Sequence, residues 1–86
     1  MNENIRLSMI EIIDDIISSI EKKTGESNMF IEFTKAKNIL INKNIDYQEK
    51  IKKNLSSGFR LIYENGLSDD YIDFNSDLLF NYLDKL

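Results

Sequence analysis

The chain has 86 residues, a formal net charge of −4 at pH 7, and no His, Cys, Trp or Pro. Without His and Cys, the usual proton shuttles near neutral pH, thiol nucleophiles and soft metal ligands are absent, so we expect no enzyme, no cofactor and no metal site. The negative charge also disfavours a nucleic-acid partner, because neutralising phosphates drives most of that affinity.

The charge is distributed unevenly. Residues 1–31 carry six acids and three bases, residues 32–60 carry three acids and seven bases, and residues 61–86 carry six acids and one base. A basic middle between acidic flanks suits helices packed side by side, and it allows an asymmetric binding surface. Apolar runs are only two or three residues long. We therefore expect residues 1–86 to form one cytoplasmic domain with no signal peptide and no membrane-spanning segment, at most peripheral to a membrane.

The first helix is predicted from about Asn4 to Lys23. Its apolar residues recur at intervals of four, three and four, which is the helical period. Gly25 follows as a left-handed exit from the helix. The predicted buried stripe consists of Met9, Ile13, Ile16 and Ile20.

A second helix is predicted from a cap at Ser27 or Asn28 to about Lys43. Its stripe consists of Met29, Phe33, Ala36 and Leu40. The third helix should begin with a capping box formed by Asp46 and Glu49, and end at Asn65-Gly66. Its stripe consists of Ile51, Leu55, Gly58 and Ile62.

We expect a specific structural role for each of two glycines, one within the third helix and one at its end. Gly58 lies on the buried stripe, where it costs roughly 1 kcal/mol relative to Ala, so we expect a neighbouring helix to approach closely there. After Gly66, Leu67 is placed to fold back onto Ile62 in a Schellman-type helix end.

The fourth helix is predicted to have Ser68 as its cap. Asn75-Ser76-Asp77 interrupts its apolar pattern, which leaves either one helix, the preferred interpretation, or two short helices with a kink. The face predicted to be buried consists of Ile72, Leu79, Tyr82, Leu83 and Leu86. Four helices with short connections predict an all-α fold, an antiparallel up-down four-helix bundle.

Acidic and aromatic residues of the fourth helix are the first candidates for a binding site. Asp73 and Asp77 share a helix face, and a solvated face is favoured over catalysis or metal binding. With Leu79 at the centre of the buried face, Phe80 lies about 100° and Phe74 about 140° away. An exposed aromatic ring among charges is typical of an interface anchor. The alternative is a kink near Asn75 that turns one or both rings inward.

Basic residues of the third helix are the second candidates. Lys50, Lys52 and Lys53 fan around the helix, together with Arg60 further along. We favour the interpretation that these basic residues provide solubility and pair with acids on neighbouring helices. The alternative is contact with an acidic protein surface or with membrane headgroups, and we retain Lys50 and Lys53 as candidate partner-binding residues.

The third helix and the turn after it resemble the bacteriocin immunity proteins of the enterocin A immunity type, which counter pediocin-like, class IIa peptides. The residues concerned are YQEKIKKNLSSGFRLIY at 47–63 and ENGLS at 64–68, with KAKNIL at 35–40 resembling the second helix of that family. The resemblance implies a cytoplasmic antiparallel four-helix bundle that protects its producer from a pore-forming peptide. It also implies recognition of a membrane sugar-transporter receptor, the mannose phosphotransferase permease, once bacteriocin has engaged it.

In that family the C-terminal half largely sets which bacteriocin is countered, so the resemblance implies a specificity surface around Phe74 and Phe80. The leading hypothesis is thus an immunity protein that binds a membrane receptor or a receptor–bacteriocin complex from the cytoplasmic side. The alternative is a small regulatory or inhibitory adaptor for a cytosolic protein. An enzyme is the weakest class, and homodimerisation through Phe74 and Phe80 is a further alternative.

Overall fold

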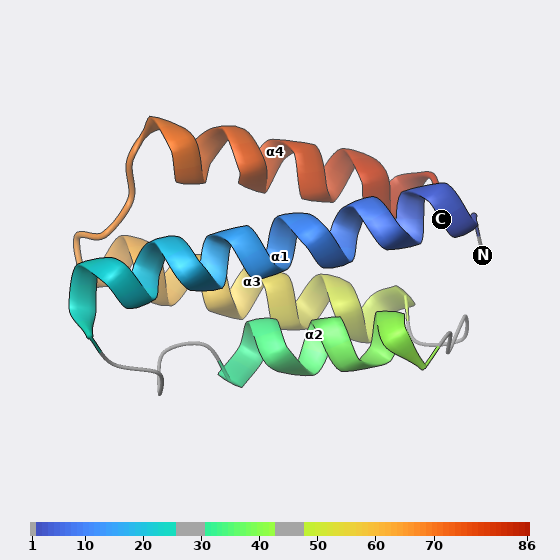
Figure 1. The fold of residues 1–86 in the computed structure, drawn as a ribbon, viewed down its shortest axis with the longest axis horizontal. Helices are drawn as coiled ribbons and strands as arrows, with labels where there is room; N and C mark the ends of the chain where they lie inside the picture. Colours follow the sequence, from blue (N-terminus) through green and yellow to red (C-terminus); the bar gives the residue numbers. More distant parts are fainter. Residues whose placement is uncertain (1, 26–30, 43–47) are drawn as a thin grey trace.

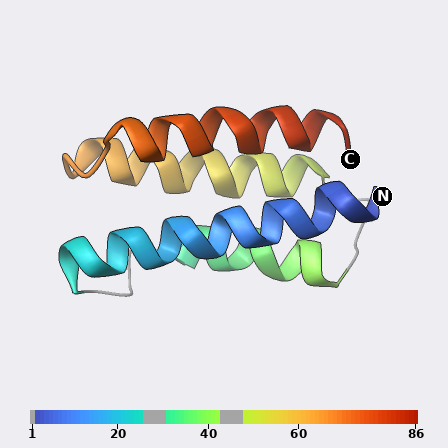
Figure 2. The ribbon, with the colours of Figure 1, turned by 45° about the horizontal axis from the view of Figure 1, so that its top comes forward.

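The computed structural model describes residues 2–25, 31–42 and 48–86, which form four α-helices with no β-strand among them. In chain order the helices are α1 (Glu3–Thr24), α2 (Ile31–Ile41), α3 (Gln48–Glu64) and α4 (Asp70–Asp84). They lie side by side along the long dimension of the molecule (Figures 1 and 2). The prediction of an all-helical chain is confirmed.

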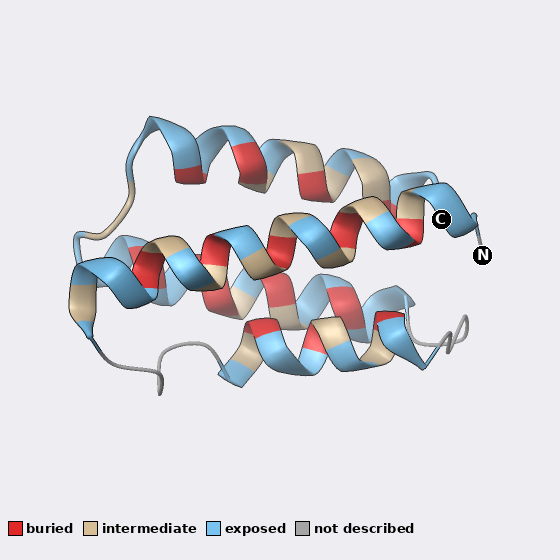
Figure 3. Cartoon of the chain, in the orientation of Figure 1, coloured by how far each residue is buried: buried red, intermediate tan, exposed pale blue. Residues whose placement is uncertain are grey.

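The four helices enclose one apolar core. Helix α1 packs against α2 and α4, and α3 packs against the same two helices, with the most extensive contact between α2 and α3. Buried residues face the middle of the molecule from all four helices (Figure 3). Burying these side chains is the main force that holds the helices together, because no disulfide is available. The core consists of Met9, Ile13, Ile16, Ile20, Phe33, Ala36, Leu40, Ile51, Leu55, Phe59, Ile62, Ile72, Leu79 and Leu83.

Helix α1 matches its prediction to within one residue at each end. The side chain of Asn2 caps it by accepting a hydrogen bond of 3.2 Å from the Ile5 N–H. Gly25 ends it with a positive φ of 69°, and the Gly25 N–H donates to the Glu21 carbonyl. A glycine adopts this left-handed conformation without steric cost.

Arg6 is a buried residue of α1 that the apolar pattern did not predict. Its guanidinium forms an ion pair with Glu3 and donates a 3.0 Å hydrogen bond to the Leu40 carbonyl. Carbonyls in the last turn of a helix have no partner within that helix, and Arg6 satisfies one of those in α2.

The predicted start and end of the second helix and the predicted start of the third helix lie outside the described residues. These predictions are the caps at Ser27 or Asn28, the stripe residue Met29, the end at Lys43 and the capping box at Asp46. Within the described part, the predicted stripes of both helices are confirmed. Phe33, Ala36 and Leu40 of α2, and Ile51, Leu55, Gly58 and Ile62 of α3, are all buried.

Gly58 of α3 lies against the ring of Phe33 of α2. A Cβ atom added to Gly58 would lie 2.8 Å from two ring carbons of Phe33. The Phe33 ring also packs edge-on against Phe59, with 5.0 Å between ring centroids. The glycine therefore leaves the space that the buried Phe33 ring occupies, as predicted from its place on the buried stripe.

The Schellman-type end predicted for α3 is confirmed. The Leu67 N–H donates to the Ile62 carbonyl at 3.0 Å, and the Gly66 N–H donates to the Tyr63 carbonyl at 3.1 Å. Gly66 has a φ of 67°, and Leu67 packs against the core. These two bonds are the pair that defines the motif.

The predicted cap of α4 is wrong by one residue. Asp69, not Ser68, is the N-cap, and its carboxylate accepts a 2.8 Å hydrogen bond from the Ile72 N–H. Lys23 of α1 forms an ion pair with Asp69 and donates to the Leu67 carbonyl. The Ser68 hydroxyl instead donates to Asp73. The ion pair with Lys23 of α1 thus holds the Asp69 carboxylate at the start of α4.

Helix α4 is continuous, as preferred, through the interruption at Asn75-Ser76-Asp77. Asn75 is buried, and its side-chain amide donates a 2.8 Å hydrogen bond to the Tyr71 carbonyl one turn earlier. This bond gives the buried amide of Asn75 a hydrogen-bond partner within α4. The helix can therefore continue through this polar position.

Candidate protein-binding surfaces

The outer side of α4 carries an exposed aromatic ring among carboxylates. Phe74 is 66% exposed, the highest fraction among the large hydrophobic side chains in the described part of the chain. Residues three and four positions apart are neighbours on a helix, so Asp70, Tyr71 and Asp77 flank Phe74. All of these residues are exposed. We define the α4 surface as Asp70, Tyr71, Asp73, Phe74 and Asp77.

Asp73 fixes the position of this surface relative to α3. One carboxylate oxygen accepts hydrogen bonds from the Ser68 hydroxyl at 2.6 Å and from the Tyr63 hydroxyl at 2.7 Å. Both bonds lower the pKa of Asp73, that from Ser68 most, while the bond to Asp73 raises the pKa of the Tyr63 hydroxyl. At neutral pH, therefore, Asp73 is an ionised acceptor and Tyr63 a protonated donor.

Three of the predicted site residues lie together on this surface: Asp73, Phe74 and Asp77. Phe80 does not lie among them. It is partly buried against the core, with its ring centroid 6.1 Å from that of Phe59. The expectation that Phe80 is an exposed anchor is thus wrong, and the reason is packing rather than a kink, because Phe59 of α3 extends the core toward it.

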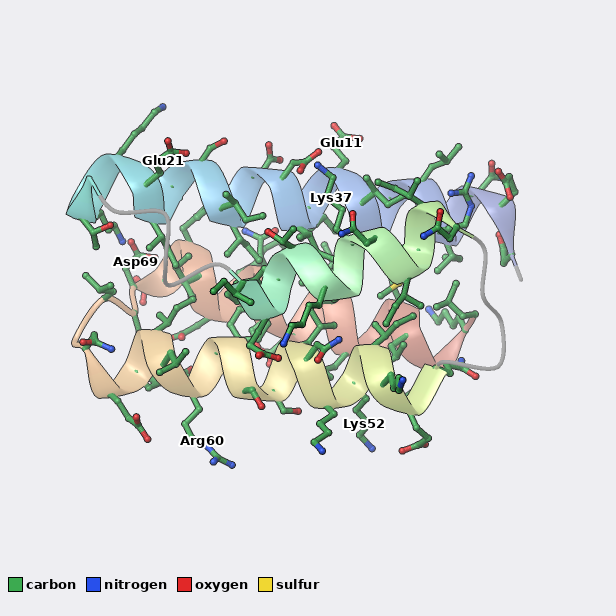
Figure 4. The ribbon with its side chains drawn as sticks, turned by 90° about the horizontal axis from the view of Figure 1, so that it is seen from below. Glu11, Glu21, Lys37, Lys52, Arg60 and Asp69 are labelled. Atoms are coloured by element: carbon green, nitrogen blue, oxygen red, sulfur yellow. The ribbon has the colours of Figure 1, made fainter. Side chains whose placement is uncertain are left out.

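The two other predicted site residues, Lys50 and Lys53, lie in a different place. Both line an open groove of about 580 Å³ between α2 and α3. Lys52 and Arg60 point away from α2 on the outer side of α3 (Figure 4). The lysines of α3 therefore fan around the helix as predicted, and only part of the set faces the groove. The lining residues are Glu32, Lys35, Asn38, Ile39, Lys50, Lys53, Asn54 and Ser57.

Two residues of α3 that line the groove, Asn54 and Ser57, were not predicted from the sequence. Asn54 lies four residues after Lys50, and Ser57 lies four residues after Lys53, which is the helical period displaced from the apolar stripe. That period could have been read in the polar residues as well. The hydrogen bonds that Asp73 accepts depend on how the turn after α3 folds, and no spacing rule indicates them.

Within the described residues, the structure contains no group of three or more Asp and Glu side chains arranged to hold a metal ion. None of the helices in residues 2–25, 31–42 and 48–86 combines the length and the apolarity needed to cross a bilayer.

Comparison of the chain with protein-family models, with curated proteins and with solved structures finds no match. The class defined by the fold and its surfaces is a helical protein with an acidic, aromatic surface on α4 and a lysine-lined groove between α2 and α3.

Proposed function

We propose that this chain is a non-enzymatic protein-binding module, built as an antiparallel up-down four-helix bundle, which contacts its partner through the α4 surface. The ribbon in Figure 1 supports the bundle, since its colours run in opposite directions along successive helices. The observation that carries the binding role is Phe74, a ring 66% exposed on a continuous helix and flanked by carboxylates. Buried aromatic anchors within a charged rim supply much of the energy of protein interfaces.

The electrostatics of the α4 surface favour binding over acid–base chemistry. A carboxyl group that transfers protons near neutral pH needs a raised pKa, which burial or a like charge usually provides. Asp73 is exposed, and its hydrogen bonds lower its pKa. It therefore serves as a fixed negative charge that a basic partner can recognise.

For the partner, we propose the receptor-bound complex that the resemblance implies. The chain would act as a bacteriocin immunity protein in the cytoplasm and bind a membrane receptor, or that receptor with its bacteriocin, from the cytoplasmic side. Two points support this proposal. Within the stretch 47–68 that resembles the immunity family, residues 48–68 form α3 and the turn into α4. The α4 surface lies in the C-terminal half, where that family carries its specificity.

Expression of the chain in a bacteriocin-sensitive Gram-positive strain tests this function directly. We expect protection against at least one member of a panel of pediocin-like peptides, and loss of protection in Phe74→Ser. The matched control is Leu7→Ser, because Leu7 is 52% exposed near the N-terminal end of α1, whereas Lys23, at the other end of α1, contacts Asp69 at the start of α4. Unchanged killing across the panel, with the folded protein present in the cells, would overturn the immunity proposal.

The second candidate is an adaptor that binds a soluble cytosolic protein through the same surface. The net charge of −4 favours it, since an acidic protein is repelled by the anionic cytoplasmic leaflet. A pull-down with the wild-type chain would then return one soluble partner and no membrane component. The Phe74→Ser bait should lose that partner, and the Leu7→Ser bait should keep it.

A further inference from the structure

The outer side of α4 is one straight stripe of exposed side chains. Asp70, Phe74, Asp77, Asn81 and Asp84 follow one another at steps of four and three residues, which keeps them on one side of the helix. All five are exposed, and the residues that α4 buries lie on the opposite side. We call these five residues the outer α4 stripe. It extends the α4 surface to the C-terminal end of the helix.

The net charge of the chain is concentrated on α4. This helix contains four aspartates and no Lys or Arg, and the residues outside it carry eleven acids and eleven bases. In the part of the chain that the structure describes, no ion pair involves Asp70, Asp77 or Asp84. The carboxylates around Phe74 are therefore available to cations of a partner.

Asp84 is unfavourable for the helix on which it lies. It occupies the last turn of α4, and no base lies in that turn. The helix dipole places partial negative charge at this end, so a carboxylate there is repelled where a cation would be favoured. A residue that breaks a local rule of stability, and that makes no ion pair within the described chain, is typical of a functional surface.

The spacing of the three aspartates matches a helical partner. Asp70, Asp77 and Asp84 recur every seven residues, or about 10 Å along the axis, and a stripe of this period drifts only about 20° per repeat. A second helix with cations every seven residues has the same repeat. An extended segment places residues of one face about 7 Å apart and so does not match it. Phe74, between the first two aspartates, offers the apolar contact that such packing needs.

We propose that the outer α4 stripe docks along a basic amphipathic helix of a partner protein. The partner helix carries Arg or Lys at seven-residue spacing opposite Asp70, Asp77 and Asp84, and an apolar side chain opposite Phe74. This inference rests on the binding role proposed for the α4 surface, and it adds the chemistry of the partner.

A second copy of the chain fits this stripe less well than a basic helix. Two copies that met through their outer α4 stripes would place aspartate against aspartate, and like charges across an interface repel each other. We therefore expect the chain alone to be monomeric in light scattering. A multimer that dissociates in Asp77→Asn with Asp84→Asn would overturn the proposal and assign the stripe to a second copy.

Fluorescence anisotropy measures the binding of a fluorescein-labelled, alanine-rich helical peptide with three arginines at seven-residue spacing and leucines between them. The ligand control is a peptide of the same composition whose arginines are distributed around the helix. We expect the control peptide to bind roughly tenfold more weakly, because its cations cannot all face the three aspartates at once. Equal affinity for the two peptides would mean that only net charge is recognised, and would overturn the proposal.

Two double variants of the chain test the stripe itself. Asp77→Asn with Asp84→Asn should weaken binding of the peptide with seven-residue spacing roughly tenfold. The urea midpoint should not fall, because Asp84 opposes the helix dipole. The matched control, Glu11→Gln with Glu21→Gln, removes the same charge from exposed positions of α1 (Figure 4) and should change affinity by less than about twofold. Equal weakening in the two variants would contradict a specific site.

Nuclear magnetic resonance of the nitrogen-15-labelled protein locates the peptide. The side-chain amide signal of Asn81 should shift on titration, and those of Asn38 and Asn54, which line the groove between α2 and α3, should not. Absence of binding, or shifts confined to other helices, would overturn the proposal.

The protection assay described above separates this inference from the proposed function. If Phe74→Ser abolishes protection while neither peptide binds, the binding role of α4 stands and the basic helix is the wrong partner. If the peptide with seven-residue spacing binds at Asn81 while no bacteriocin is countered, the docking stands and the immunity proposal fails.

Discussion

Helices α3 and α4 bury similar apolar stripes but present opposite charges to solvent. Helix α3 carries Lys50, Lys52, Lys53 and Arg60 on its exposed positions, and α4 carries Asp70, Asp73, Asp77 and Asp84. Their packing also differs: the contact between α3 and α2 is more extensive than the contact between α3 and α4.

This difference shows that the apolar and the polar residues of an amphipathic helix have separate roles. The apolar residues of each helix determine where it lies in the bundle, while the polar residues between them determine what it presents to a partner. On the α2–α3 side, Phe33 packs closely against Gly58, and an open groove lies between the same two helices. On the α4 side, a continuous helix presents a projecting ring at Phe74. The two surfaces should therefore respond differently to substitution.

The largest expected effect on stability distinguishes the buried side of α4 from its exposed side. Leu79→Ala removes a fully buried side chain and should lower the free energy of unfolding by about 2–5 kcal/mol. Phe74→Ser lies five positions earlier on the exposed side and should change it by less than about 0.5 kcal/mol. Urea unfolding followed by circular dichroism measures both. Similar losses in the two variants would mean that Phe74 is a structural residue, and the binding role assigned to it would be lost.

A smaller effect tests the close approach of α2 and α3. Gly58→Ala places a methyl group against the buried Phe33 ring, and the strain should exceed the gain in helix propensity, leaving a net loss of about 1–2 kcal/mol. Ser57→Ala, the adjacent position facing the groove, is the control and should be nearly neutral.

The double variant Gly58→Ala with Phe33→Leu sharpens that test. If the clash with the ring causes the loss, the double variant should be more stable than the sum of its single changes predicts. A stabilising Gly58→Ala would contradict the close approach and would leave only the ordinary preference for alanine in a helix.

The smallest effect concerns the fixed charge of the α4 surface. Ser68→Ala and Tyr63→Phe should each raise the pKa of Asp73, and Ser68→Ala should raise it more, because its hydroxyl contributes the larger part of the lowering. The carbon-13 chemical shift of the Asp73 carboxyl carbon, followed during an acid titration, measures this pKa. Ser56→Ala, an exposed serine of α3, is the control. An unchanged Asp73 titration in both variants would mean that neither hydrogen bond forms in solution.

The same bonds imply a pH dependence of stability. The pKa of Asp73 is lower in the folded chain than in the unfolded chain, so its hydrogen bonds stabilise the fold at pH values above the ordinary carboxyl pKa. That contribution is lost as the pH falls through the lowered pKa of the folded state. The urea midpoint of the wild-type chain should therefore fall more steeply with acid than that of Ser68→Ala.

Local patterns were enough to predict most of the fold. The stripe of α1, the left-handed residue at Gly25 and the Schellman-type end at Gly66 depend on neighbours along the chain, and the structure confirms all three. Gly58 is an instance of a tertiary contact that sequence could indicate, because a glycine on a buried stripe is unfavourable without a reason in packing.

The residues that were misplaced depend on contacts between helices. Ser68 and Asp69 are both good caps, and Lys23 of α1 favours the second. Phe80 lies about 100° from the centre of the buried face, but Phe59 of α3 extends the core toward it. Arg6 is charged in an apolar pattern, and part of what satisfies its buried guanidinium is the carbonyl of Leu40 on α2. A helical wheel of one segment contains none of this information.

Side chains from other helices hold both ends of α4. Lys23 of α1 contacts Asp69 at its first turn, and the Gln48 amide of α3 donates a 2.8 Å hydrogen bond to the Leu83 carbonyl at its last turn. A helix restrained in this way loses little further backbone entropy when a second protein docks on it. Recognition at Phe74 should therefore resemble rigid docking, in which complex formation is fast and affinity is set by how slowly the partner dissociates.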